Sequence, residues 1–592
     1  MLYQNIPDQV EFTPVEIKKP NVSLKLMTLV VSVGAIIGFA SLYNPAKVPI
    51  SHRDLLQEQA RDLIMKDGVM ALGDNLESPF GQMAPEHPAG KNRFPKNYDF
   101  FTVDLFANPV IQQALSSLRE KKDADLKAAC SGPTGNIDLF INQNAFTADL
   151  VYEEALTAFG LDCRLTAGQE IAFLGVVDEL GNVQNIVQLP HRAQSMAMYN
   201  STTVLASTTS GTYLWNYARG LLNKLAIEAG PAAMAFRSLE NKFYGQCPKS
   251  GHGASAEAEL QEEVFDEADE DADDMNSICS FDGTTGKTLF TGDPEGFYWQ
   301  DNDAKFNYIS FNGDSLYVSE GRKSALKKVD MKTGEVEWNM GGPNNDFTVF
   351  DFEGDVIMQA GQAAPDAEDD SFGMAAKTNM QAWSHLSRFQ SVDGKYFTLF
   401  DNQVAGSKKA SMVDDTVHSS RMIVLFVDEE NRVAREIYSH NVGDASSFYG
   451  GCDILPSGNV LGSSYPEWVY PDTLDMQYQQ NIWEVNPNGR VAWRVAIKGL
   501  NPMAPSDVAS PYPKYLNNMN GNNEHIPIGW NIMSVERFYN KPIFTQPCSL
   551  VVNDRNYVMV TPFNSVRTQE DTPGVIMLAS IAADPVALVR QE

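Results

Sequence analysis

Positively charged residues are scarce in this sequence. Its 592 residues include 45 Lys and Arg against 76 Asp and Glu, which gives a formal net charge of -31 at pH 7. Binding to nucleic acid or to an anionic membrane surface requires clustered Lys and Arg, so we expect no nucleic-acid partner. Hydrophobic residues make up 43% of the chain and charged residues 20%, which is typical of a chain that buries enough apolar surface to fold.

Several catalytic motifs are missing as well. The sequence contains no G-x-x-x-x-G-K-[ST] phosphate loop, no G-x-G-x-x-G after a strand, no H-E-x-x-H and no G-x-S-x-G. A nucleotide-dependent enzyme is therefore disfavoured, and we expect neither a cofactor nor a metal. Only eight histidines are present, so candidate proton-transfer residues are few.

Cysteine is sparse and widely spaced. No C-x-x-C pair occurs, which disfavours a structural zinc site or a thioredoxin-type motif. Three disulfides in a non-cytosolic protein and six buried free thiols both remain open, with Cys247–Cys279 the favoured pair because it brackets the most acidic stretch. The six cysteines are Cys130, Cys163, Cys247, Cys279, Cys452 and Cys548.

Long apolar runs are absent except near the N-terminus. Residues 26–43, LMTLVVSVGAIIGFASLY, carry no charge, and about 18 such residues are just enough to cross a bilayer core. We expect a cytosolic tail over residues 1–23, a transmembrane signal-anchor over 24–43 and a lumenal or extracellular remainder. The alternatives are a cleaved signal peptide or a buried core helix. The sequon at Asn200 predicts a glycosylation site on the lumenal side.

Residues 44–130 predict a stem of helices and loops. LLQEQARDLI and VIQQALSSLREK both space their apolar residues as one face of a helix. No residue of this stem points to chemistry. The main domain is expected over residues 131–592.

From residue 131 onward, short β-branched and aromatic runs alternate with polar turns. A period of about 50 residues with one hairpin per unit is the signature of a β-propeller, so we predict an all-β propeller of six blades, with seven as the alternative. Two insertions are expected, a helical one at about 215–245 and an acidic loop at about 254–275, whose carboxylates repel one another. The acidic loop lacks the D-x-D-x-D-G calcium pattern. The predicted turns lie near Gly181, Gly286, Gly334, Asn431 and Gly489, with weaker ones at Ser210-Gly211 and Asp393-Gly394.

Four segments follow one another in the order HLSRF…YFTLFDN, SSRMIVLFVDEENRVAREIY, GGCDILPSGNVLGSSYPEW and NIWEVNPNGRVAWRV. This order resembles the C-terminal half of the arylsulfotransferase family. The similarity covers about residues 295–500 and, more weakly, 165–295; it does not cover the stem.

The resemblance implies a propeller with a central funnel in which a sulfuryl group moves between phenols. A histidine attacks the sulfur of a phenolic sulfate, a sulfohistidine forms, and an acceptor phenol takes the group without nucleotide or metal. Matched by motif, His385 corresponds to the histidine before the FDN strand, and Arg322 and Arg421 correspond to the family's arginines. A planar guanidinium pairs two sulfate oxygens and stays charged.

Two departures from the family pattern bear on the activity. Where the family has a D-x-x-H-x-N segment, this chain has Lys305 in place of the histidine. A lysine does not shuttle protons at neutral pH unless its pKa falls far. The segment FYGGCDILPSGNVLG contains no histidine, and His440 just upstream is the alternative nucleophile. Structural roles are the competing interpretation: a core histidine at position 385, salt-bridged arginines at 322 and 421, and a solvated Lys305.

Two functions follow from this. One is a propeller whose active site is degraded and which serves as a lumenal or extracellular binding or assembly module. The other is a nucleotide-independent sulfuryl transferase acting between phenolic sulfates and phenols. The expected partners are the membrane, through the N-terminal helix, and a phenolic or sulfated small molecule or another lumenal protein. A third interpretation, a quinone-dependent dehydrogenase, is disfavoured because its regular tryptophan repeat is missing.

Overall fold

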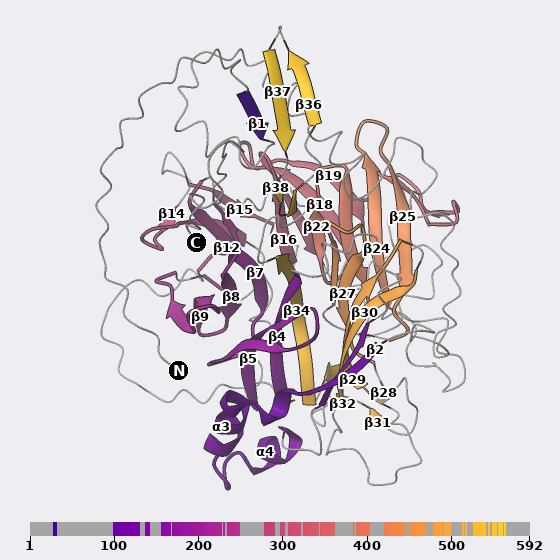
Figure 1. Ribbon diagram of the computed structural model, residues 1–592. Coiled ribbons are helices and arrows are strands. Elements are labelled where there is room, and N and C mark those ends of the chain that lie inside the picture. Colours follow the sequence, from indigo (N-terminus) through magenta and orange to yellow (C-terminus); the bar gives the residue numbers. More distant parts are fainter. Residues whose placement is uncertain are drawn as a thin grey trace, which may run out of the picture.

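The computed structural model is nearly all β (Figure 1). The residues that it describes are 28–31, 99–130, 136–141, 155–166, 169–227, 229–230, 234–238, 240–248, 277–289, 296–301, 306–320, 324–342, 344–361, 383, 386–402, 420–444, 446, 450–466, 468–469, 478–487, 489–498, 512–513, 515–517, 525–527, 529–539, 543–544, 548–552, 555–560 and 562–563.

Six sheets of four to six strands form the blades of a propeller, which confirms the predicted fold and blade number. Counted from the innermost strand outward, blade 1 is β34 (Gly529–Tyr539), β4 (Ala155–Thr166), β5 (Gln169–Asp178) and β6 (Val183–Leu189), and blade 2 is β7 (Ser195–Asn200), β8 (Thr203–Thr208), β9 (Gly211–Asn216) and β10 (Leu221–Lys224). Blade 3 is β11 (Met234–Arg237), β12 (Lys242–Gln246), β13 (Ser277–Asp282) and β14 (Thr288–Leu289), with β15 (Tyr298–Gln300) also paired to β13, and blade 4 is β16 (Phe306–Asn312), β17 (Ser315–Glu320), β18 (Ala325–Asp330) and β19 (Val336–Gly341). Blade 5 is β22 (Phe389–Ser391), β23 (Tyr396–Asp401), β24 (Arg421–Asp428) and β25 (Val433–Asn441), extended by β20 (Thr348–Phe350) and β21 (Val356–Met358), and blade 6 is β26 (Gly451–Ile454), β27 (Val460–Ser464), β29 (Tyr478–Val485) and β30 (Val491–Lys498), extended by β3 (Asn136–Ile141) and β2 (Asp99–Asp104).

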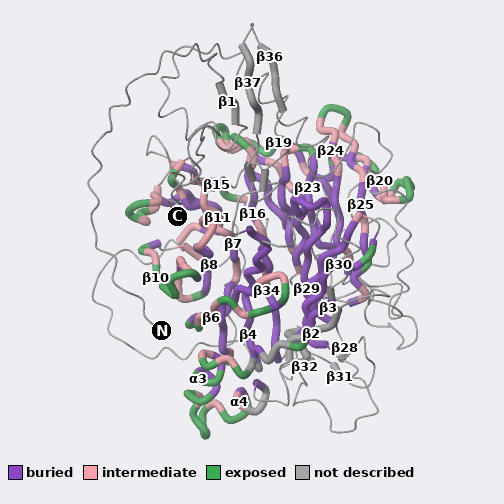
Figure 2. The backbone as a smooth tube through the Cα atoms, viewed as in Figure 1, coloured by how far each residue is buried: buried purple, intermediate pink, exposed green. Residues whose placement is uncertain are grey.

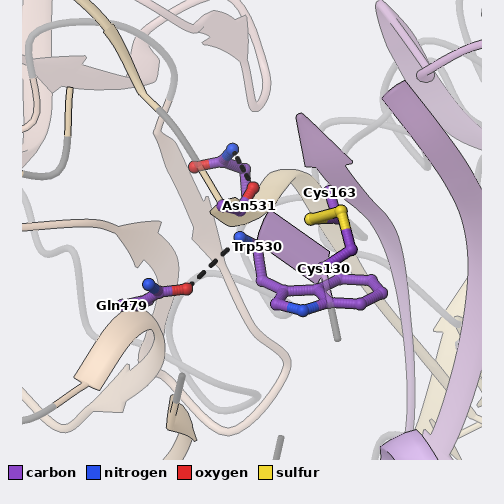
Figure 3. Close-up of a disulfide and its surroundings, with 6 residues drawn as sticks. Cys130, Cys163, Gln479, Trp530 and Asn531 are labelled. Atoms are coloured by element: carbon purple, nitrogen blue, oxygen red, sulfur yellow. Dashed lines mark hydrogen bonds between the residues drawn. A yellow bond between two sulfur atoms is a disulfide. The ribbon is translucent and has the colours of Figure 1, made fainter. Parts of the chain in front are cut away.

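The ring is closed by strands from both ends of the chain. In blade 1, β34 pairs antiparallel with β4, with Trp530 opposite Cys163. In blade 6, β3 pairs with the outer strand β30. A disulfide between Cys130 and Cys163 adds a covalent link to this closure, and the indole of Trp530 lies beside it (Figure 3).

The hydrophobic core is divided among the six interfaces between neighbouring blades. Successive residues of a strand point to opposite faces of its sheet, so each strand supplies side chains to both neighbouring blades. In β4, for example, Phe159 and Leu161 pack toward blade 6 while Leu156 and Ala158 pack toward blade 2. Figure 2 shows the buried residues concentrated along the strands of every blade.

Hairpin turns follow the predicted positions. Gly181, Gly286, Gly334 and Gly489 have positive φ and join the third and fourth strands of their blades, and at the fifth turn Arg432 has the positive φ. Gly211 and Gly394 lie in turns between other strands, and in blade 2 the equivalent turn is at Gly220. The wide interval between Gly334 and Asn431 therefore holds one enlarged blade, which leaves six blades rather than seven.

The predicted helical insertion at 215–245 is wrong. This stretch contains the strands β9 to β12. Gly220, with φ +66°, turns β9 back into β10, and the Gly230-Pro231 pair interrupts any helix in the middle of the stretch. The acidic loop predicted at 254–275 lies outside the described residues.

Two helices lie within the stretch predicted as a stem. VIQQALSSLREK lies largely in α3 (Pro109–Ser117), which buries Ile111 and Leu115, and α4 (Ala124–Cys130) follows. The short η3 (Leu105–Ala107) precedes them, but β2 at the start of this stretch belongs to blade 6. The helix expected in LLQEQARDLI lies outside the described residues.

Most of the predicted membrane segment, 24–43, also lies outside the described residues. Its described part, β1 (Thr28–Val31), is a strand that pairs in parallel with β37 (Arg555–Val560). Within the described part of the chain, no helix is long and apolar enough to cross a membrane. The remaining strands are β28 (Trp468–Val469), β31 (Tyr512–Pro513), β32 (Tyr515–Asn517), β33 (His525–Pro527), β35 (Ile543–Phe544), β36 (Cys548–Val552) and β38 (Pro562–Phe563).

Candidate functional site

The two faces of the propeller differ in their connections. We call loop face the one where the second strand of a blade passes to the third and where one blade passes to the next; the opposite one is the hairpin face. The helices α3 and α4, which connect β2 to β3 at the loop-face end of blade 6, lie at the lower end of Figure 1. Helix α4 packs against β4 and β34 of blade 1, so part of the stem lies on the loop face.

The predicted site residues all belong to the loop-face connections of blades 4 and 5. Lys305 directly precedes β16, Arg322 falls between β17 and β18, and His385 precedes β22. These three lie outside the described residues, but the strand ends that flank them are described. Arg421 begins β24 and His440 is the next-to-last residue of β25. The topology therefore brings the chain segments of all five to one face and two neighbouring blades.

The segment that follows His385 is held by side chains from two of the motifs singled out in the sequence. Asn307, from the segment that contains Lys305, donates a hydrogen bond to the carbonyl oxygen of Leu386. The hydroxyl of Ser387 donates to Asn402, the last residue of the FDN motif. Two neighbouring residues are thus fixed from two separate elements.

Arg388 fixes the same segment from the centre of the ring. Its guanidinium forms a buried ion pair with Glu536 of β34, donates to the carbonyl oxygen of Val535 at 3.2 Å, and lies over the ring of Tyr308 at 5.4 Å. Arg388 adjoins the innermost strand of blade 5, whereas its partners lie on the innermost strands of blades 1 and 4. Neither Arg388 nor Glu536 was predicted from the sequence, where the only signal was an arginine placed directly before the apolar strand residue Phe389.

Arg421 is fully engaged by neighbouring side chains. Its Nη2 lies 2.8 Å from Asp401 and its Nη1 lies 3.1 Å from Glu436, while Nη1 also donates to Ser439 at 3.2 Å. Its Nε donates to Asp401 at 3.2 Å. Burial lowers the pKa of the guanidinium, but the carboxylates of Glu436 and Asp401 outweigh this effect and raise the pKa of Arg421.

Glu436 connects Arg421 to the residue two before His385. Its Oε1 accepts a hydrogen bond of 2.9 Å from the indole Nε1 of Trp383. Burial raises the pKa of Glu436, and the charge of Arg421 opposes this rise. The four side chains of Trp383, Glu436, Arg421 and Asp401 form one buried network at the loop-face end of blade 5.

His440 lies in the fourth strand of blade 5 and is only 6% exposed. Its ring lies 6.5 Å from that of Tyr438, and Met422 is its neighbour on β24. Arg421, its sequence-predicted companion, is on the same adjacent strand.

Asn200 lies at the end of β7, where the chain turns into β8 on the hairpin face. The side chain is half-buried, and its Oδ1 accepts hydrogen bonds from the Thr202 amide at 3.0 Å and hydroxyl at 3.3 Å. Glycosylation there stays a prediction.

The cysteines whose side chains the structure describes are divided between disulfides and a thiol. The favoured pair Cys247–Cys279 is confirmed, with a Cα–Cα distance of 5.0 Å, and Cys130–Cys163 is a second disulfide. Cys452 is a buried free thiol, so neither three disulfides nor six free thiols describes the chain. Burial raises the pKa of the Cys452 thiol well above its usual range.

Within the described residues, one group of carboxylates is close enough together to hold a metal ion. Asp351, Glu353 and Asp355 meet in the exposed turn between β20 and β21. Exposed acidic turns of this kind are common without an ion, and this one lies apart from the predicted site.

Comparison with known proteins supports the family resemblance. Residues 267–498 match the model of the arylsulfotransferase family, a stretch that runs from β13 of blade 3 to β30 of blade 6 and contains every predicted site residue except Asn200. No curated protein matches the sequence.

Several solved structures align with part of the chain at low similarity. Hydrazine synthase from Kuenenia stuttgartiensis aligns over 53% of this chain and 73% of its own, at 10% identity and a TM-score of 0.30. A protein of unknown function from Bacteroides caccae aligns over 58% of this chain and 94% of its own, at 9% identity and a TM-score of 0.33. At these scores the alignments carry no functional argument.

Proposed function

We propose that the chain is a membrane-anchored, arylsulfotransferase-like propeller that binds a phenolic sulfate or another sulfated small molecule on the loop face of blades 4 and 5. In this proposal the site binds its ligand without efficient sulfuryl transfer. The uncharged segment at 26–43 supports the anchor. The two disulfides support a non-cytosolic propeller, because disulfides persist in oxidising compartments.

The proposed loss of sulfuryl transfer rests on the hydrogen bonds of Arg421. The resemblance assigns this arginine to the sulfate oxygens, but its Nε, Nη1 and Nη2 all donate to Asp401, Glu436 or Ser439. Moving the guanidinium onto a sulfate would leave two buried carboxylates without their partner, which is costly. Arg421 therefore organises blade 5 rather than stabilising a transferring sulfuryl group.

A second candidate function, the active transferase, is supported by a different observation. Side chains from three elements hold residues 386–388, directly after His385. Such support is what a catalytic side chain needs to keep its geometry. In this reaction the His385 imidazole nitrogen would form a bond to sulfur while the S–O bond to the leaving phenolate breaks.

The test uses the full-length protein in detergent with 4-nitrophenyl sulfate. Binding is measured by calorimetry, and nitrophenol release is measured with phenol as acceptor. His385→Ala is the test variant and His191→Ala, a partly exposed histidine between blades 1 and 2, is the control. Binding that is weakened by His385→Ala, without nitrophenol release, supports the proposal. Release that depends on His385 establishes the transferase instead, and absence of both binding and release from folded protein contradicts both functions.

A further inference from the structure

Arg164 is a buried arginine without a partner in the described part of the chain. It lies near the loop-face end of β4, is 7% exposed, and its Nε has no hydrogen-bond acceptor. No described residue forms an ion pair or hydrogen bond with its guanidinium. By contrast, the buried arginines Arg388 and Arg537 each form an ion pair with a buried glutamate.

The carboxylates closest along the sheet form no ion pair with Arg164. Glu170 lies opposite it on β5, but its Oε1 accepts the backbone N–H of Arg192 at 2.8 Å. Asp162 precedes Arg164 by two residues on the same side of β4, and it is buried without forming an ion pair with Arg164. A buried charge costs several kcal/mol unless it is paired and hydrogen-bonded, so an oxyanion bound at this guanidinium would offset that cost.

The innermost strand places no side chain of its own opposite Arg164, although the Gln479 side chain packs against this position. The neighbour of Arg164 on the innermost strand β34 is Gly529, which has no side chain and has φ +85°. By strand alternation Arg164 shares the face of Ala158 and Gly160, which packs toward blade 2. A second buried arginine, Arg192, lies in the connection from β6 of blade 1 to β7 of blade 2.

We infer that Arg164 forms a binding site for an oxyanion, such as a sulfate, a phosphate or a carboxylate, at the loop-face rim between blades 1 and 2. The planar fork of a guanidinium pairs two oxygens of such a group. This site lies across the six-bladed ring from the site in blades 4 and 5, and it does not rest on the proposed function.

The experiment measures thermal unfolding of the full-length protein at constant ionic strength with increasing sulfate, phosphate or 4-nitrophenyl sulfate in place of chloride. Arg164→Met removes the charge, and Arg164→Lys keeps the charge but loses the fork. Arg219→Met, in the exposed turn between β9 and β10, is the control. Equilibrium dialysis with labelled sulfate measures binding directly.

For the wild type and the Arg219 variant we expect a saturable rise in Tm of roughly 2 °C or more. Arg164→Met should lose this rise and unfold at a higher temperature than the wild type in chloride alone, because the unpaired charge is gone. Arg164→Lys should bind at least about tenfold more weakly. If only 4-nitrophenyl sulfate raises the Tm, the ligand is an esterified oxyanion. If inorganic sulfate or phosphate raises the Tm equally, the ligand is the free ion. An unchanged response in Arg164→Met, a lower Tm of that variant in chloride, or no wild-type response would overturn the inference.

Discussion

Arg388, directly before the innermost strand of blade 5, forms an ion pair with Glu536 of the innermost strand of blade 1, although 148 positions separate them in the sequence. Their side chains are only 4% and 0% exposed. This contact joins the segment behind His385 to the strand that closes the ring, so the candidate site and the closure of the fold share one interaction.

Removing one partner of this pair should destabilise the propeller. Arg388→Met or Glu536→Gln is expected to cost about 3–5 kcal/mol of unfolding free energy, because each leaves the other group buried and unpaired. The double variant Arg388→Met/Glu536→Leu should recover most of the loss. Urea unfolding measures both effects. Lys332→Met breaks the exposed pair with Asp314 and should leave the midpoint unchanged; equal losses in the single and double variants would contradict the prediction.

The cysteines give a prediction that mass spectrometry can check. Peptide mapping under non-reducing conditions should recover Cys130–Cys163 and Cys247–Cys279. Alkylation of the folded protein should not label Cys452, because the thiol is buried and its raised pKa disfavours the reactive thiolate. Unfolding should expose it to labelling. Rapid labelling of Cys452 in folded protein would show that the interface between blades 5 and 6 opens.

Loss of the Cys130–Cys163 disulfide should weaken the closure of the ring. Cys130→Ala/Cys163→Ala is expected to cost roughly 2–5 kcal/mol, since the bond ties α4 to β4 next to the pairing of β4 with β34. Unfolding of the variant and of the wild type is compared with and without a reductant. A reductant that destabilises both proteins equally would show that this bond contributes nothing.

Local turn chemistry made the fold predictable. Gly181, Gly286, Gly334 and Gly489 needed positive φ, and an acceptor side chain precedes each of them, so these hairpins were visible in the sequence. The strands at 215–245 were not, because their many alanines and leucines also suit a helix and only pairing with neighbouring strands selects the extended form.

The site was less predictable than the fold. The order of the motifs identified the segments of His385, Arg421 and Lys305, which lie on one face of the propeller. The face of a segment depends only on which strand ends it connects, and strand ends can be predicted from the sequence. The occupation of Arg421 by Asp401 and Glu436, and the pairing of Arg388 with Glu536, depend on contacts between strands far apart in sequence. The unpaired state of Arg164 likewise becomes visible only once its neighbours are placed.

The hairpin carboxylates predict a dependence of stability on acid pH. Asp282, Asp330 and Asp428 each accept hydrogen bonds in their turns, chiefly from backbone N–H groups of Thr285 and Thr333 and from the side chain of Asn431, and their pKa values lie below the ordinary 3.8. Because the folded pKa is the lower one, the stabilisation is fully present above pH 3.8 and is lost as the pH falls through the folded pKa.

Replacing these carboxylates by amides should therefore flatten the acid limb of the stability curve. An Asp282→Asn/Asp330→Asn/Asp428→Asn variant is expected to lose less Tm than the wild type between about pH 4 and pH 2. Glu335→Gln removes the same charge from the hairpin of Asp330 without touching the turn bonds. If Glu335→Gln reduces the loss of Tm at acid pH as much as each Asp→Asn substitution does, the cause is a general charge effect and not the hydrogen bonds in the turns.

Trp383 offers a test of the link between the buried network and ligand binding. Trp383→Phe removes the indole donor from Glu436, and a buried carboxylate that loses a hydrogen bond costs about 1–3 kcal/mol. Trp338→Phe is the matched control, because this buried tryptophan lies in the same hydrophobic cluster and its Nε1 has no acceptor. Both variants lose similar apolar volume, so the difference between their unfolding free energies isolates the hydrogen bond.

If the network positions the segment around His385, Trp383→Phe should also weaken the binding of 4-nitrophenyl sulfate several-fold while Trp338→Phe leaves it unchanged. Equal binding by both variants would separate the network from the ligand site and leave it a purely structural element of blade 5.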